Sequence, residues 1–137
     1  MQDIWTNIIL NDSDEITALT MLSSQKQAIK EKSAGELTIE IETIDYHEYD
    51  KPMKNLTLYI LYVMAPKVGN YRKRILTVVE DKNKDRFPVD IISHIDETTK
   101  KDVTQDKFLE SVTEIISCKV VSRTIQDLYI QSIYCSK

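Results

Sequence analysis

The chain has 137 residues, of which 42% are hydrophobic and 29% are charged, as is ordinary for a soluble globular protein. Its two glycines and three prolines exclude long flexible linkers and a glycine-rich phosphate loop. A net charge of −4 argues against non-specific binding to nucleic acid, which requires a basic surface. We therefore expect a single domain over residues 1–137 with no nucleic-acid partner.

The N-terminal stretch "MQDIWTNIILNDSDE" lacks the positively charged region of a signal peptide. The longest apolar run, residues 56–65, is about half of the roughly 20 residues that a membrane helix requires. Cys118 and Cys135 have no cysteine or histidine at metal-ligand spacing. These features predict a cytoplasmic protein with free thiols and no membrane association.

Residues 11–35 carry the clearest helix pattern. Asp12 and Glu15 have the spacing of a capping box, and Gly35 stands where a helix commonly ends. Apolar residues recur on one face at helical spacing. We expect one N-terminal helix that packs on a sheet through Ile16, Leu19, Leu22 and Ile29.

The next segments predict strands. Residues 36–44, "ELTIEIETI", alternate strictly, so Glu40 and Glu42 share the exposed face of a half-buried strand. Residues 56–66, "LTLYILYVMAP", are apolar on both faces, as in a central strand. Tyr59 and Tyr62 within it are expected to pack in the sheet.

Two further strands are predicted in "YRKRILTVVE" and "RFPVDIISHI", joined by a charged hairpin turn at residues 81–86. Pro88 has no N–H to donate, which predicts that residues 87–92 form an edge strand. Residues 98–103, "TTKKDV", are interpreted as a polar connection.

Thr104 can cap a helix with apolar residues at helical spacing, and Ser122 can cap another after a break at Val121. Strands grouped between helices predict an α+β fold. We expect a two-layer sandwich with an N-terminal helix, a four-stranded, mainly antiparallel sheet and one or two C-terminal helices.

Glu80 and Lys82 have the spacing found on a core strand of metal-dependent nucleases of the PD-(D/E)xK kind. There a second acid helps to bind Mg²⁺ and the lysine positions the attacking water. Asp50 is the best upstream acid by spacing. The dense polar sequence that begins at Asp81 instead predicts a solvated hairpin tip, so this catalytic set is the alternative hypothesis.

His47 and His94 could join Asp50 and Asp96 in a metal site, but nothing in their local spacing enforces it. We expect two isolated loop histidines. The leading hypothesis assigns no catalytic residue, metal or cofactor.

The acidic strand and the tyrosine-containing loop after it are the predicted binding surface. The leading hypothesis is a non-enzymatic, cytosolic interaction protein, of an immunity or antitoxin-like type or an accessory factor of a defence locus. Its partner is expected to be a basic protein; a homo-oligomer and a small-ligand pocket between helix and sheet are left open. The predicted binding residues are Glu40, Glu42, Tyr46, His47, Glu48 and Tyr49.

The stretch "MAPKVGNYRKRILTVVEDKNKDRFPVDI" has an Ala-Pro, a Tyr-Arg and an aromatic-Pro-Val-x-Ile element in this order. In this pattern, and in the helix "LSSQKQAIKEKSAGEL", the chain resembles a group of small uncharacterised bacterial α+β proteins. The resemblance covers most of residues 16–130 and implies a fold but no activity. The basic pair Lys73-Arg74 departs from the usual continuation of the pattern.

Overall fold

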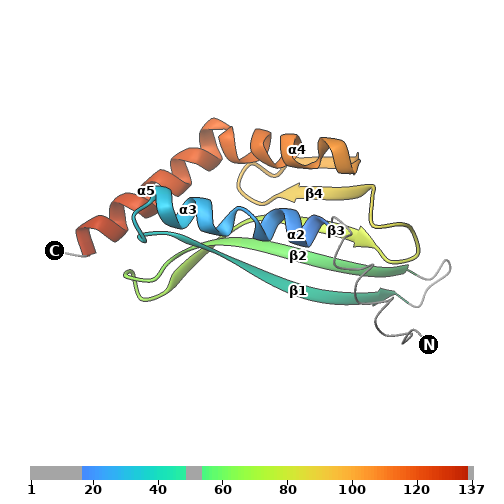
Figure 1. The fold of residues 1–137 in the computed structure, drawn as a ribbon, viewed down its shortest axis with the longest axis horizontal. Helices are drawn as coiled ribbons and strands as arrows, with labels where there is room; N and C mark the ends of the chain where they lie inside the picture. Colours follow the sequence, from blue (N-terminus) through green and yellow to red (C-terminus); the bar gives the residue numbers. More distant parts are fainter. Residues whose placement is uncertain (1–16, 49–53, 136–137) are drawn as a thin grey trace, which may run out of the picture.

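The computed structural model describes residues 17–48 and 54–135 (Figure 1). Two short helices precede five strands, and two longer helices follow them. The elements are α2 (Ala18–Ser23), α3 (Lys26–Lys32), β1 (Thr38–Glu48), β2 (Lys54–Ala65), β3 (Tyr71–Asp81), β4 (Val89–Ser93), β5 (Thr99–Val103), α4 (Gln105–Ser117) and α5 (Lys119–Cys135).

The strands form one antiparallel sheet in the order β1-β2-β3-β4-β5, so that each strand pairs with its neighbour in sequence. The α+β class is confirmed, but the sheet has a fifth strand, β5, where a polar connection was predicted. Because β4 pairs with strands on both sides, the prediction of an edge strand at residues 87–92 is wrong. Pro88 lies just before β4 and does not interrupt its hydrogen bonds.

The predicted N-terminal helix is divided into α2 and α3. A capping box begins α2: the hydroxyl of Thr17 accepts the N–H of Thr20 at 3.1 Å, and that of Thr20 accepts the N–H of Thr17 at 3.0 Å. The cap predicted at Asp12 lies outside the described residues. After α3, Gly35 has a φ of 80° and donates its N–H to Lys30 O at 2.8 Å, which confirms the predicted glycine stop.

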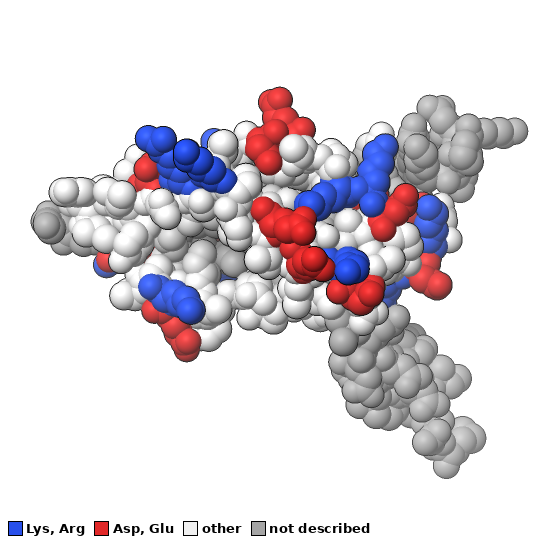
Figure 2. Space-filling view, turned by 90° about the horizontal axis from the view of Figure 1, so that it is seen from above, with Lys and Arg blue, Asp and Glu red and all other residues white. Residues whose placement is uncertain are grey.

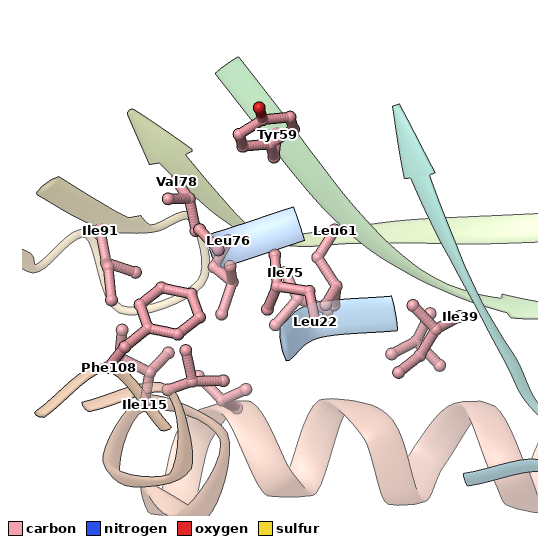
Figure 3. Packing of buried hydrophobic residues seen from close by; sticks show 14 of the residues in the cluster. Leu22, Ile39, Tyr59, Leu61, Ile75, Leu76, Val78, Ile91, Phe108 and Ile115 are labelled. Carbon is pink, nitrogen blue, oxygen red and sulfur yellow. The ribbon is translucent and has the colours of Figure 1, made fainter. Parts of the chain in front are cut away.

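The core lies on one face of the sheet, which we call the helix face. Its members from β2 are alternate residues, Tyr59, Leu61, Val63 and Ala65, and they pack with apolar side chains of all four described helices or their flanks. Helix α3 packs on β1, α5 on β2 and α4 on β5. Figure 3 shows Phe108 of α4 beside sheet residues of this fully buried layer.

A β-bulge in β3 matters for the opposite face. The register of β2 against β3 shifts after Leu61, which leaves Ile75 as the extra residue. Ile75 and its neighbour Leu76 are therefore both buried in the core. The shift also places Arg74 and Asp81, seven positions apart, on the same face of the sheet.

Two C-terminal helices are confirmed, but the break between them is at Cys118 rather than at Val121 and Ser122. The Cys118 N–H still donates to Ile115 O at 3.3 Å, and α5 begins at the next residue. Thr104 is the N-cap residue of α4, as predicted, with its hydroxyl donating to Asp106 at 2.6 Å. Within residues 17–48 and 54–135, no helix is long and apolar enough to cross a membrane.

Candidate functional site

The face of the sheet opposite the helices, which we call the open face, combines apolar and charged side chains. The strand registers align its residues in four rows across the sheet. The first row contains Tyr46, Leu56 and Asp81, the second Ile44, Leu58, Val79 and Asp90, the third Glu42, Ile60, Thr77 and Ile92, and the fourth Glu40, Tyr62 and Arg74.

A charged network surrounds Tyr62 at one end of the open face. The guanidinium of Arg72 lies 4.1 Å from the centre of the Tyr62 ring, a cation–π contact. Arg72 also donates to Glu40 at 2.8 Å and lies 3.6 Å from Glu42. The tyrosine hydroxyl donates to Glu42 at 3.4 Å. The acidic strand predicted from the sequence is thus balanced by an arginine of β3.

The structure places the predicted binding residues on two faces. Glu40, Glu42 and Tyr46 share the open face, whereas His47 lies on the helix face with Nδ1 2.8 Å from Asn55 Oδ1. Tyr46 and His47 belong to β1 rather than to the predicted loop. Glu48 ends β1, and Tyr49 lies outside the described residues. The sequence could not reveal Arg72 as a partner because that contact depends on strand order and the bulge.

The two edges of the sheet differ in length and in charge. At one edge, β5 has five residues and carries Lys100 and Lys101, and lysines protect edges from pairing with other chains. At the other edge, β1 has eleven residues and pairs on one side only among the described segments. Ile44 and Tyr46 on β1 are 38% and 48% exposed. Among the described strands, β1 is therefore the longer of the two edges and the one without lysine.

Glu80 does not lie at a solvated hairpin tip as the sequence predicted. It is 6% exposed within β3, and its Oε2 accepts a hydrogen bond from the Tyr59 hydroxyl at 3.0 Å. Its other oxygen, Oε1, is buried without a hydrogen-bond partner. Burial, with the added effect of the Glu80 carboxylate, raises the pKa of Tyr59 to about 12, so the phenol remains a donor at neutral pH.

Lys82 lies on the same face as Glu80, because the ladder continues past the end of β3 through the Lys82 N–H, which donates to Asn55 O at 2.8 Å. Its ammonium lies 3.0 Å from Asp45 Oδ1, and Thr57 donates to the same carboxylate at 3.1 Å. The hydrogen bond from Lys82 lowers the pKa of Asp45 below its usual value. Lys82 therefore acts as the counter-ion of Asp45.

The hollow beside Glu80 carries both signs of charge. Glu80, Lys82 and Tyr59 line it, its volume is about 490 Å³, and its wall also includes Asp81, Lys84, Asp85 and Arg86. Within the part of the chain that the structure describes, no three His, Cys, Asp or Glu side chains are grouped as metal ligands. Asp50, the acid predicted from spacing, lies outside that part.

The two histidines are far from forming a common site. His47 lies on the helix face of β1, whereas His94 follows β4 and reaches the open face. There His94 Nε2 is 2.5 Å from Thr77 Oγ1. Burial, and secondarily the charge of Arg74, lowers the pKa of His94, so its ring is neutral at pH 7.

Seen from above the view of Figure 1, acidic and basic side chains alternate across the molecule, and neither sign forms a continuous patch on the described residues in that view (Figure 2). Comparisons of the chain with family models, curated proteins and solved structures find no match. The function is therefore argued from the geometry of the chain itself.

Proposed function

We propose that this protein is a non-enzymatic interaction protein that binds a basic partner by accepting an extended segment of it along β1. The observation that carries the proposal is the eleven-residue edge strand whose outer side pairs with no other described segment. Outward N–H and C=O groups on such an edge are a template for an added strand, which gains affinity from main-chain hydrogen bonds.

The charge of β1 selects the kind of segment that can pair with it. β1 contains no Lys or Arg, but its acidic residues are Glu40, Glu42, Asp45 and Glu48. If β1 paired with β1 of another copy, acidic side chains would gather along the shared edge, which destabilises a pair. A strand with lysine or arginine side chains instead meets opposite charge.

The existing ion pairs on β1 leave room for such a strand. The side chains of Arg72 and Glu40 are 41% and 44% exposed, and those of Lys82 and Asp45 are 46% and 54% exposed. Half-exposed pairs of this kind contribute roughly 0–1 kcal/mol, so a partner's cations can share these carboxylates at little cost. Ile44 and Tyr46 supply the apolar contacts that anchor an interface.

Immunity proteins and antitoxins act in this way, by covering a partner through surface complementarity and without chemistry of their own. The proposal places this protein in that functional class. The expected partner is a basic protein that presents an extended edge or tail.

The test titrates isotope-labelled protein with short β-prone peptides that alternate lysine with valine or threonine, and with acidic peptides of the same pattern. We expect the basic peptide to shift the NMR signals of β1 and to protect its outward amides from hydrogen exchange. The acidic peptide should do neither. Equal responses to both peptides would show that the charge of β1 does not select the partner.

A matched pair of variants locates the interaction. The double change Glu40→Lys/Glu42→Lys should weaken binding of the basic peptide at least about tenfold, because it reverses the charge of the edge. Glu110→Lys on α4, where the side chain is 61% exposed, changes charge away from β1 and should leave affinity unchanged. Equal affinity in both variants contradicts the proposed edge, provided that circular dichroism shows both to be folded.

A magnesium-dependent nuclease that uses Glu80, Lys82 and Asp50 is the second candidate. One observation favours it: Glu80 and Lys82 share a face at the end of β3, and a buried Glu80 oxygen has no partner. Two contacts oppose it, because Tyr59 occupies one oxygen of Glu80 and Asp45 takes the charge of Lys82. We therefore rank it below the interaction protein.

The nuclease is tested by incubating plasmid DNA with the full chain and Mg²⁺. Cleavage that is lost in Glu80→Gln but retained in Glu114→Gln, an exposed change on α4, would establish it. Absence of cleavage by the wild-type chain across a range of Mg²⁺ concentrations would eliminate this candidate and leave the interaction proposal unaffected.

A further inference from the structure

The middle of the open face is apolar and extends over several strands. Leu58 and Val79 stand beside each other in one row, and Ile60, Thr77 and Ile92 stand in the next. None of these side chains belongs to the cluster that packs with the helices. Ile60 and Thr77 are already covered by the chain itself, at 6% and 5% exposed, whereas Leu58, Val79 and Ile92 are half-buried and Ile44 is 38% exposed. An antiparallel sheet with one solvent-facing side normally carries polar residues there, so these partly exposed apolar side chains suit an interface.

Two charges flank this apolar centre at opposite ends of β3. Arg74, which is exposed, lies in the row of Tyr62, and Asp81, which is partly exposed, lies in the row of Leu56. Neither charge forms an ion pair with a residue of the described segments, in contrast to Arg72 with Glu40 and Glu42. At about 3.3 Å per residue the two charges are roughly 20 Å apart, with the apolar rows between them.

This arrangement is self-complementary under a twofold axis. Let the twofold axis lie between the two sheets, perpendicular to the strands and level with Val78, which is midway between the second and third rows. The second row of one copy then lies over the third row of the other, and the first row lies over the fourth. Arg74 then lies over Asp81 of the second copy, and Asp81 over Arg74. The two central rows face each other, with Leu58 over Ile60 and Val79 over Thr77 in the middle. Their acidic ends, Glu42 and Asp90, lie over Ile44 and Ile92 at the rim, and Tyr62 faces Leu56. A closed dimer requires such an isologous patch, in which each surface is its own complement.

We propose that the open face packs against the open face of a second copy of this chain. Two sheets in this arrangement stack about 10 Å apart with their strands within roughly 30° of each other. The proposal leaves the outward main-chain groups of β1 free at the edge, so strand addition and pairing of the open faces can occur together, with Ile44 contributing to both surfaces. Charge complementarity favours a second copy, because Arg74 and Asp81, which form no ion pair within the described segments, meet twice in the twofold arrangement.

The expected dimer is weak. Three or four strands about 4.8 Å apart and a length of roughly 20 Å give a footprint on the order of 400 Å². A standard interface buries about 800 Å² on each partner, so measurements must extend to high concentrations, from about 10 μM to about 1 mM.

Sedimentation of the full chain, with four variants, tests the proposal. We expect the wild-type chain to show a monomer–dimer equilibrium. Arg74→Glu or Asp81→Arg alone should raise the dissociation constant at least about tenfold, because each places like charges together twice in the dimer. The double change Arg74→Glu/Asp81→Arg should restore it to within about threefold, because opposite charges meet again. Arg123→Glu on the exposed side of α5 is the control and should leave the constant unchanged.

Chemical cross-linking tests the geometry separately, in a background that carries Cys118→Ser and Cys135→Ser. Val79→Cys lies beside the twofold axis and should be joined to its counterpart by a short bismaleimide, which spans the gap of about 10 Å between stacked sheets, whereas Leu109→Cys, 41% exposed on α4, should not. A monomer at every concentration, single reversals without effect, a double variant as weak as the singles, or equal cross-linking at both sites would each overturn the proposal.

Discussion

The two faces of this sheet are built from the same strands but differ in burial and in the contacts that their side chains make. On β4, Ile91 is fully buried on the helix face, whereas its neighbour Ile92 is only half-buried on the open face. On β3, the helix face ends in the buried pair of Glu80 and Tyr59, whereas the open face ends in the partly exposed Asp81, which accepts the N–H of Asn83 at 2.9 Å. The helix face therefore holds the fold together, and the open face keeps partly exposed side chains that a partner can contact.

The largest expected difference between the two faces is in the free energy of unfolding of Ile91→Ala compared with Ile92→Ala. We expect Ile91→Ala to lower the free energy of unfolding by about 3–4 kcal/mol, because it opens a cavity in a close-packed core. Ile92→Ala should cost about 1 kcal/mol, since that side chain is already partly solvated. Urea unfolding at low protein concentration measures both values.

Equal losses in the two variants would contradict the assignment of a single core on the helix face. At high protein concentration the same two variants also test dimerisation. If the open faces pair, Ile92→Ala should also weaken the dimer, whereas Ile91→Ala should affect only the fold.

The sequence predicted the α+β class, the strands of the central hairpins and the two C-terminal helices. It missed β5 because Thr99–Val103 is polar, and an exposed edge strand needs charges to avoid pairing with other chains. Pro88 suggested an edge because a proline within a strand must be one, but here it only precedes the strand. Local sequence cannot distinguish a proline within an edge strand from a proline just before an inner strand.

The candidate site was predictable only in part. Strict alternation placed Glu40 and Glu42 on one face, which the structure confirms. Their partner Arg72 could not be predicted, because the contact depends on the order and register of three strands. Glu80 was predicted to end a strand beside a solvated hairpin turn, because polar neighbours follow it at once. Its burial comes from contacts distant in sequence, chiefly the Tyr59 hydroxyl.

A second prediction concerns the polar end of the helix face. Tyr59→Phe removes the donor to Glu80 and leaves both oxygens of a 94% buried carboxyl group without a partner, since Glu80 is 6% exposed. We expect a loss of about 1–3 kcal/mol in the free energy of unfolding at pH 7. Because phenylalanine keeps the aromatic ring at this position, the effect must come from the lost hydroxyl.

The same hydroxyl predicts a pH dependence. The pKa of Tyr59 is about 12 in the folded chain and near its ordinary value of 10.0 in the unfolded chain. The unfolded tyrosine therefore loses its proton first, and the stabilisation, complete below pH 10, is lost as the pH rises from 10 to 12. Unfolding measured from pH 8 to 11 should show a shallower decline in Tyr59→Phe than in the wild type. Parallel curves would contradict the buried donor.

On the open face, His94 should act at the other end of the pH scale and with the smallest effect. Burial, followed by the charge of Arg74, lowers its pKa below the ordinary value of 6.5, and Thr77 holds the neutral ring. The unfolded histidine therefore takes up a proton first, so the stabilisation is present above pH 6.5 and is lost as the pH falls through the folded-state pKa. Comparing His94→Gln with His47→Gln isolates this contribution. The His47 variant should keep the wild-type decline between pH 7 and 5, and the His94 variant should flatten it. A decline unchanged in both would mean that His94 is as solvated in the native state as in the unfolded chain, and that the open face excludes less water than its packing indicates.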